Sequence, residues 1–110
     1  MEITIKLKGL TIKACPREFV EEKLKSLEKL MPQNLGTKLE VEASRTSMHH
    51  NKGDIYRAEI QVELPKSVLV RAVSEKERLD MALLDAKKEL EIQLKKYKEK
   101  PMAERNKERE

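Results

Sequence analysis

The stretch "YRAEIQVELPKSVLVRAV", residues 56 to 73, decides the fold, because it contains two strand patterns separated by a short turn. From Tyr56 to Leu64 every second side chain is apolar and the others are charged or amides, a period typical of a strand with one buried face. Pro65-Lys66-Ser67 predicts a turn, and "VLVRAV" predicts a second strand rich in β-branched residues. Together they predict a β-hairpin.

Two more stretches alternate in the same way. They are "EITIKLK", residues 2 to 8, and "TKLEVEASR", residues 37 to 45. With the hairpin they predict four strands, of which the last three are consecutive and antiparallel. The side chains expected on their inner faces are Ile3, Ile5, Leu7, Leu39, Val41 and Ala43.

Apolar residues recur at helical spacing in two other stretches. The first helix is expected from Pro16, which suits a first helical turn, to Met31. The second is expected from Ser74, which has Glu77 three residues later in a capping-box pattern, to about Pro101. Its inner stripe is predicted to consist of Leu79, Leu83, Ala86, Leu90, Leu94 and Tyr97.

The resulting order, βαβββα, predicts an α+β domain. Both amphipathic helices must bury their apolar stripes, and the sheet has one apolar face to offer. We therefore expect both helices on one face of the sheet and solvent on the other. Residues 1–100 are expected to form this single domain, and the charged segment 101–110 is expected to be a disordered tail.

Charge and cysteine content narrow the class of protein. The 24 basic and 20 acidic side chains give a formal net charge of +4, a mild preference for polyanionic partners. The single cysteine, Cys15, excludes an internal disulfide and fits a reducing compartment, so we expect a cytoplasmic protein. No stretch has the pattern of a signal peptide or a membrane span.

The lysines of the second helix are expected to gather on one side. At about 100° per residue, Lys87, Lys88, Lys95 and Lys98 share one flank of the inner stripe, and Asp85, Glu89 and Gln93 share the other. A one-sided row fits contact with an RNA backbone, and a solvated face remains the alternative. On the first helix, Lys25 and Lys29 point outward among glutamates, where a salt-bridged exposed surface is the alternative, and Lys23 lies beside the apolar stripe.

The aromatic residues are few. Phe19, Tyr56 and Tyr97 all fall on inward-facing positions, which disfavours recognition of single strands by stacking on exposed aromatic platforms. If RNA is the partner, we expect recognition by backbone and shape.

The sequence has no pattern for catalysis or for a cofactor. His49, His50 and Cys15 are too few and wrongly spaced for a zinc site, and the glycines do not form a phosphate-binding loop. We therefore expect no metal, no cofactor and no enzyme. "HHNKG", residues 49 to 53, is interpreted as a polar loop that leads into the third strand.

These elements and several strings together resemble the ribosome hibernation promoting factor family, also known as protein Y or ribosome-associated inhibitor. "HHNKGDIYRAEIQVELPKSVLVRA", residues 49 to 72, is similar to the family's loop and hairpin. "EFVEEKLKSLEKL" is similar to its first helix and "ELEIQLKKYKEK" to the end of its second. The resemblance covers nearly all of residues 1 to 100.

The resemblance implies a domain reminiscent of double-stranded-RNA-binding modules, with the small ribosomal subunit and its RNA as partners. Such a domain docks in the mRNA and tRNA channel and silences idle ribosomes under stress, without catalysis. The RNA-binding residues that it implies are Lys23, Lys29, His50, Lys52, Arg57, Arg71, Lys87, Lys88, Lys95, Lys96 and Lys98.

The sequence departs from the family pattern in two ways. Many relatives carry a basic residue at the position of Ile92, and Met81 and Leu84 also project from the outer side of the second helix. This apolar strip supports an alternative function, a protein-interaction module. In addition, the chain resembles the short form, and we expect it to lack the second, dimerising domain of the long members. Ribosome pairing would then need a separate factor, and we expect the isolated protein to be a monomer.

Overall fold

The computed structural model describes residues 2–30, 38–47, 54–64 and 68–99, and of residues 47, 54 and 97–99 it describes the backbone alone. The predicted order βαβββα and the α+β class are confirmed. The elements are strand β1 (Glu2–Lys8), helix α1 (Arg17–Leu24), 3₁₀ helix η1 (Lys25–Leu30), strands β2 (Lys38–Ser47), β3 (Asp54–Leu64) and β4 (Val68–Lys76), and helix α2 (Leu79–Glu99).

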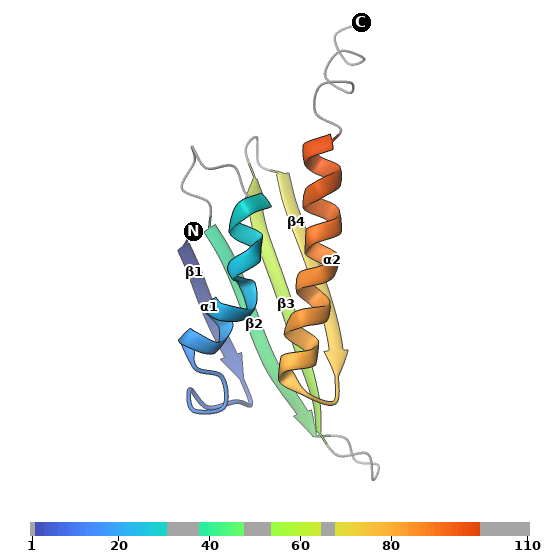
Figure 1. Ribbon diagram of the computed structural model, residues 1–110. Coiled ribbons are helices and arrows are strands. Elements are labelled where there is room, and N and C mark those ends of the chain that lie inside the picture. The colour runs from blue at the N-terminus through green and yellow to red at the C-terminus, as the bar shows by residue number, and fades with distance from the viewer. Residues whose placement is uncertain (1, 31–37, 48–53, 65–67, 100–110) are drawn as a thin grey trace, which may run out of the picture.

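The four strands form one mixed sheet in the order β1-β2-β3-β4. β1 runs parallel to β2, since the chain crosses over through the first helical segment, and the other two pairs are antiparallel as predicted. Val41, Ile60 and Ala72 pair across the three consecutive strands, so their side chains point to one face. Figure 1 shows that α1 and α2 both cover that face, which confirms the predicted layers.

The core lies between this sheet face and the helices. The predicted inner stripe of α2 is buried from Leu79 to Leu94, together with Ala82, and the side chain of Tyr97 lies outside the described residues. Burial of each large aliphatic side chain contributes about 1.5 to 3 kcal/mol before the cost in conformational entropy. The largest fully buried side chains include Leu24, Leu27, Leu39, Ile60, Leu83, Leu90 and Leu94.

The sequence predicted one continuous α-helix for the first helical segment, and this prediction is wrong. Pro16 is its N-cap, α1 ends at Leu24, and the chain continues as a 3₁₀ helix to Leu30. With three residues per turn, this tighter helix keeps Leu24, Leu27 and Leu30 on one face, whereas an α-helix would rotate Leu30 away. The spacing of the leucines therefore favours the change of helix type. Met31 lies outside the described residues.

The boundary between β4 and α2 was also predicted wrongly. Ser74 is not the N-cap of a helix, because β4 continues to Lys76 and α2 begins at Leu79. Ser74 pairs with Ala58 of β3, it is buried, and its hydroxyl donates a hydrogen bond of 2.6 Å to the carboxylate of Asp85. Strand pairing with the long β3 therefore overrides the local capping-box pattern.

Candidate nucleic-acid interface

Lysines from two segments of the chain line one open cleft on the helical face. The cleft has a volume of about 860 Å³, and four of the side chains around it are Lys23 of α1, Lys25 and Lys29 of η1, and Lys87 of α2. We call it the lysine cleft. Lys23, Lys29 and Lys87 were expected to bind RNA, and the fold brings them together from positions about 60 residues apart in the chain. The remaining lining residues are Ile3, Glu21, Glu22, Ser26 and Glu28.

The charge in the lysine cleft is mixed. Lys87 Nζ lies 3.4 Å from a carboxylate oxygen of Glu91, and both side chains are largely shielded from solvent. Lys23 Nζ lies 5.5 Å from the centre of the Phe19 ring, a cation–π contact that fits the predicted place of Lys23 beside the apolar stripe. These contacts hold two of the lysines in place, so the cleft is a structured surface with both signs of charge.

Farther along α2, the lysines are more accessible. Lys88, Lys95 and Lys96 are exposed, and none of them forms an ion pair with another residue of the described ranges. Lys88 and Lys95 lie on the predicted flank. Lys96 lies on the opposite flank, three residues after Gln93, whose amide donates a hydrogen bond of 2.9 Å to the Arg71 carbonyl of β4. We call these three residues the α2 lysines.

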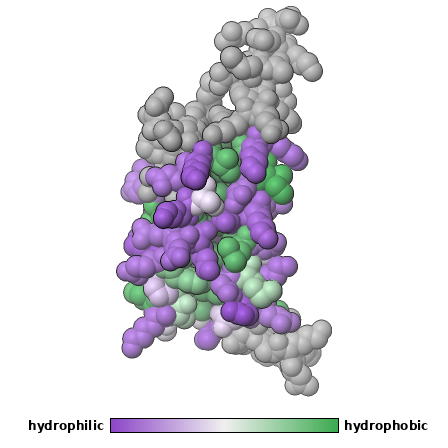
Figure 2. Space-filling model, in the orientation of Figure 1, coloured by the Kyte–Doolittle hydropathy of each residue, from purple (hydrophilic) through white to green (hydrophobic). Residues whose placement is uncertain are grey.

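The helical face is mainly hydrophilic. Figure 2, in the orientation of Figure 1, shows polar side chains over most of this face, with smaller hydrophobic areas between them. The side chain of Lys98, the fourth member of the predicted row, lies outside the described residues. Lys25 was missing from the predicted RNA-binding residues, although its outward position on the same segment as Lys29 was a usable signal.

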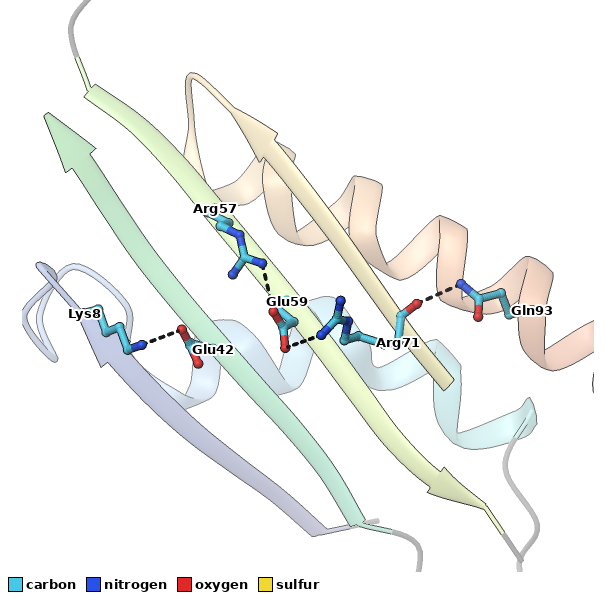
Figure 3. A network of polar contacts seen from close by, with 6 residues as sticks. All are labelled: Lys8, Glu42, Arg57, Glu59, Arg71 and Gln93. Atoms are coloured by element: carbon cyan, nitrogen blue, oxygen red, sulfur yellow. Dashed lines mark hydrogen bonds and ion pairs between the residues drawn. The ribbon is translucent and has the colours of Figure 1, made fainter. Parts of the chain in front are cut away.

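The two predicted arginines lie on the other face of the sheet. Arg57 Nη2 is 2.9 Å from one carboxylate oxygen of Glu59, and Arg71 Nη1 is 3.9 Å from the other. Figure 3 shows this chain of contacts across β3 and β4, on the face away from the helices. The fold therefore does not bring Arg57 and Arg71 together with the lysine cleft, and one flat contact cannot include both groups.

A comparison with family models gives a match over residues 3–101, to the model described as Sigma 54 modulation protein / S30EA ribosomal protein. The chain belongs to this family. No curated protein sequence matches the chain.

Solved structures agree with membership of the S30EA family. The chain is similar to the N-terminal domain of Protein Y from Thermus thermophilus, with 33% identity over 88% of this chain and 99% of that one, and a TM-score of 0.68. It also shares its fold with a ribosomal subunit interface protein from Coxiella burnetii, with 24% identity over 89% and 98% of the two chains and a TM-score of 0.66. The suspected resemblance to the protein Y family is thus confirmed.

The remaining predicted candidates of this S30EA-family chain are placed as follows. His49, His50 and Lys52 lie outside the described residues. Cys15 is buried, and this burial raises the pKa of its thiol above the ordinary value. Within the described ranges, no three His, Cys, Asp or Glu side chains gather where they could hold a metal ion. None of the described helices has both the length and the apolar character of a membrane span.

The outer side of α2 carries the apolar strip expected from the sequence. Met81 is 47% exposed and Ile92 is 49% exposed, whereas Leu84 is half-buried. Lys88 lies between them along the helix, so the strip is interrupted by positive charge. An interface that buries a helix against a protein partner has a more continuous apolar surface than this strip.

Proposed function

We propose that this protein binds the small ribosomal subunit in the mRNA and tRNA channel of the cytoplasmic ribosome and keeps idle ribosomes from translating. Membership of the S30EA family supports this proposal, as does the fold shared with a ribosomal subunit interface protein. The observation that carries it is the lysine cleft, since Lys23, Lys29 and Lys87 converge there from separate helical segments.

The mechanism is occupation of a site rather than chemistry. Lysines of the cleft and the α2 lysines contact phosphates of ribosomal RNA, and each contact releases condensed counterions into solution. The glutamates of the cleft restrict where a phosphate can lie, so the contact has a preferred position. The domain that fills the channel then excludes messenger and transfer RNA.

Salt dependence of binding tests this proposal. We expect the protein to co-sediment with small subunits, with an affinity that falls steeply as salt rises. The variant Lys88→Gln/Lys95→Gln/Lys96→Gln should bind more weakly, and the slope of log K against log salt should be smaller by about 2 to 3. These side chains are exposed and have no described partner, so the fold is not affected.

A matched control makes the same change of charge on the sheet face. In the variant Lys6→Gln/Lys8→Gln/Lys38→Gln, three exposed lysines of β1 and β2 lose their charge, at the cost of the surface pair between Lys8 and Glu42. Subunit binding by this variant should equal that of the wild type. If the two variants lose affinity equally, only net charge matters, and the assignment of the helical face is wrong.

Inhibition of translation requires its own measurement. Addition of the protein to a reconstituted translation reaction should reduce product, and prior loading of the ribosomes with messenger and initiator transfer RNA should protect them. Equal inhibition of loaded and empty ribosomes would contradict occupation of the channel.

A second candidate function, a protein-interaction module, is favoured by the exposure of Met81 and Ile92. It predicts self-association or capture of a partner through the outer side of α2, and Ile92→Lys should abolish either one. Analytical ultracentrifugation distinguishes the two functions. A monomer at all concentrations, together with subunit binding unchanged by Ile92→Lys, would exclude this candidate.

A further inference from the structure

Two of the three aromatic residues line a second depression on the molecule. It has a volume of about 400 Å³, and we call it the aromatic hollow. Figure 1 shows why these residues meet: α1, β3 and α2 all begin at the same end of the sheet. The lining residues are Ala14, Phe19, Tyr56, Glu77, Arg78, Leu79 and Asp80.

The aromatic side chains are only partly used by the core. Phe19 and Tyr56 pack against it, as the inward positions predicted, but both are half-buried and keep surface that faces the hollow. A ring that is fixed by the core on one side and open on the other provides a rigid stacking surface at low cost in conformational entropy. The inward positions disfavoured stacking of single-stranded bases on exposed aromatic platforms, and this hollow is a part of the described surface where two half-buried rings still offer such a contact.

The polar side chains of the hollow indicate the charge of the ligand. Arg78 Nη2 lies 3.0 Å from a carboxylate oxygen of Asp80, and Glu77 is exposed nearby. Lys23 lies over the Phe19 ring, so two cations and two carboxylates surround the site. These charges balance. A neutral ligand with a flat apolar face and a polar edge fits them better than a free anion or a cationic side chain.

The hollow adjoins the lysine cleft through one pair of residues. Phe19 lines the hollow, Lys23 lines the cleft, and the Lys23 ammonium lies 5.5 Å from the centre of the Phe19 ring. A nucleic-acid strand with its phosphates along the cleft therefore passes the mouth of the hollow. A base turned out of such a strand has the flat face and polar edge that the hollow requires.

We propose that the aromatic hollow binds one unpaired nucleobase of the RNA whose backbone lies along the lysine cleft, with a preference for guanine. The proposal rests on RNA as the partner in the proposed function. Stacking on Phe19 and Tyr56 accepts any base. Guanine also presents hydrogen-bond acceptors for the Arg78 guanidinium. Its amino and imino groups can donate to the carboxylate of Glu77 or Asp80, whereas uracil lacks an exocyclic amino group.

The test compares two pentaribonucleotides, UUGUU and UUUUU, by NMR titration and by affinity. With UUGUU, the ring signals of Phe19 and Tyr56 should move, and the affinity should be at least about tenfold higher than for UUUUU. The variant Arg78→Ala should lose this preference and still bind UUUUU, because the stacking surface remains. Arg71→Ala, which removes an exposed arginine from the opposite sheet face, is the matched control and should keep the preference.

Several outcomes would overturn the proposal. The proposal is wrong if the two oligonucleotides bind with equal affinity and the ring signals of Phe19 and Tyr56 do not move. Ring signals that move with N-acetyl-lysine amide and not with either oligonucleotide would assign the hollow to a protein side chain. Sedimentation of the wild type with small subunits is measured in parallel. Subunit binding without guanine preference refutes only the proposal that the hollow binds a nucleobase, whereas absence of subunit binding refutes the proposed function.

Discussion

Gly9 follows β1 and has a backbone conformation that other residues adopt only with strain. Its φ is +68°, and a Cβ at this position would lie 2.8 Å from the carbonyl oxygen of Arg45. Gly9→Ala should therefore lower the free energy of unfolding by about 1 to 3 kcal/mol, measured by urea denaturation. Gly9→Asn should lower the free energy of unfolding somewhat less, because asparagine tolerates the left-handed region. Part of the loss remains, since the Cβ of asparagine makes the same close contact.

The control for this prediction lies in the same loop. Ile12 is 76% exposed, so Ile12→Ala should change stability by no more than about 0.5 kcal/mol. If Ile12→Ala costs as much as Gly9→Ala, the loop is sensitive to any change, and the conformation of Gly9 is not the reason.

Cys15 provides a prediction about pH. Burial raises the pKa of its thiol in the folded protein above that of the unfolded chain, so folding favours the neutral thiol. The resulting stability is complete below the unfolded pKa and is lost as pH rises through the folded pKa. Stability should therefore decrease in the alkaline range, and Cys15→Ala should remove that part of the decrease. At pH 8, alkylation of the native protein should be much slower than alkylation in urea.

At the level of elements, the contact of Ser74 with Asp85 joins β4 to α2. Ser74→Ala should lower stability by about 1.5 kcal/mol, because a hydrogen bond to a charged acceptor is lost. A double-mutant cycle with Asp85→Ala should show coupling of similar size. Glu77→Ala should have little effect, since α2 begins after Glu77. A large loss of stability in Glu77→Ala would indicate that the capping box predicted from the sequence does form in solution.

The strands and the faces of the elements were predictable from the sequence, because the alternation from Tyr56 to Leu64 continues without a break in the folded chain. The ends of the helices and strands were not predictable in this way. β2 and β3 extend toward each other as far as the pair Ser47–Asp54, and β4 extends to Lys76, because pairing with a neighbouring strand stabilises residues whose own pattern is weak.

The candidate site was predictable in part, for a similar reason. Helical periodicity placed Lys87 correctly beside the inner stripe, but its meeting with Lys23 and Lys29 depends on how two helices pack. Arg57 had been placed on the polar face by alternation, so the sequence already separated it from the helices. Only the resemblance grouped Arg57 with the lysines. The aromatic hollow involves three elements whose ends meet only in the folded chain, and no local pattern signals it.

For the whole molecule, the two faces should differ in access when the protein is bound. In separate variants, Lys88→Cys places a thiol on the helical face and Glu63→Cys places one on the sheet face, both at exposed positions. Small subunits should slow alkylation of the first thiol at least about tenfold and leave the second unchanged, since the proposed function covers only the helical face. Equal protection of both thiols would show that the subunit encloses the domain, and protection of the second alone would reverse the orientation.

The ion pairs of the sheet face also affect how the protein meets a polyanion. Lys8 lies 3.2 Å from Glu42, and Arg57 and Arg71 share Glu59, so two carboxylates offset two of these three positive charges at short range. None of the α2 lysines forms an ion pair with another described residue. If RNA is the partner, as proposed, long-range attraction should turn the helical face toward it before contact, so that a larger fraction of diffusional encounters begins in a productive orientation.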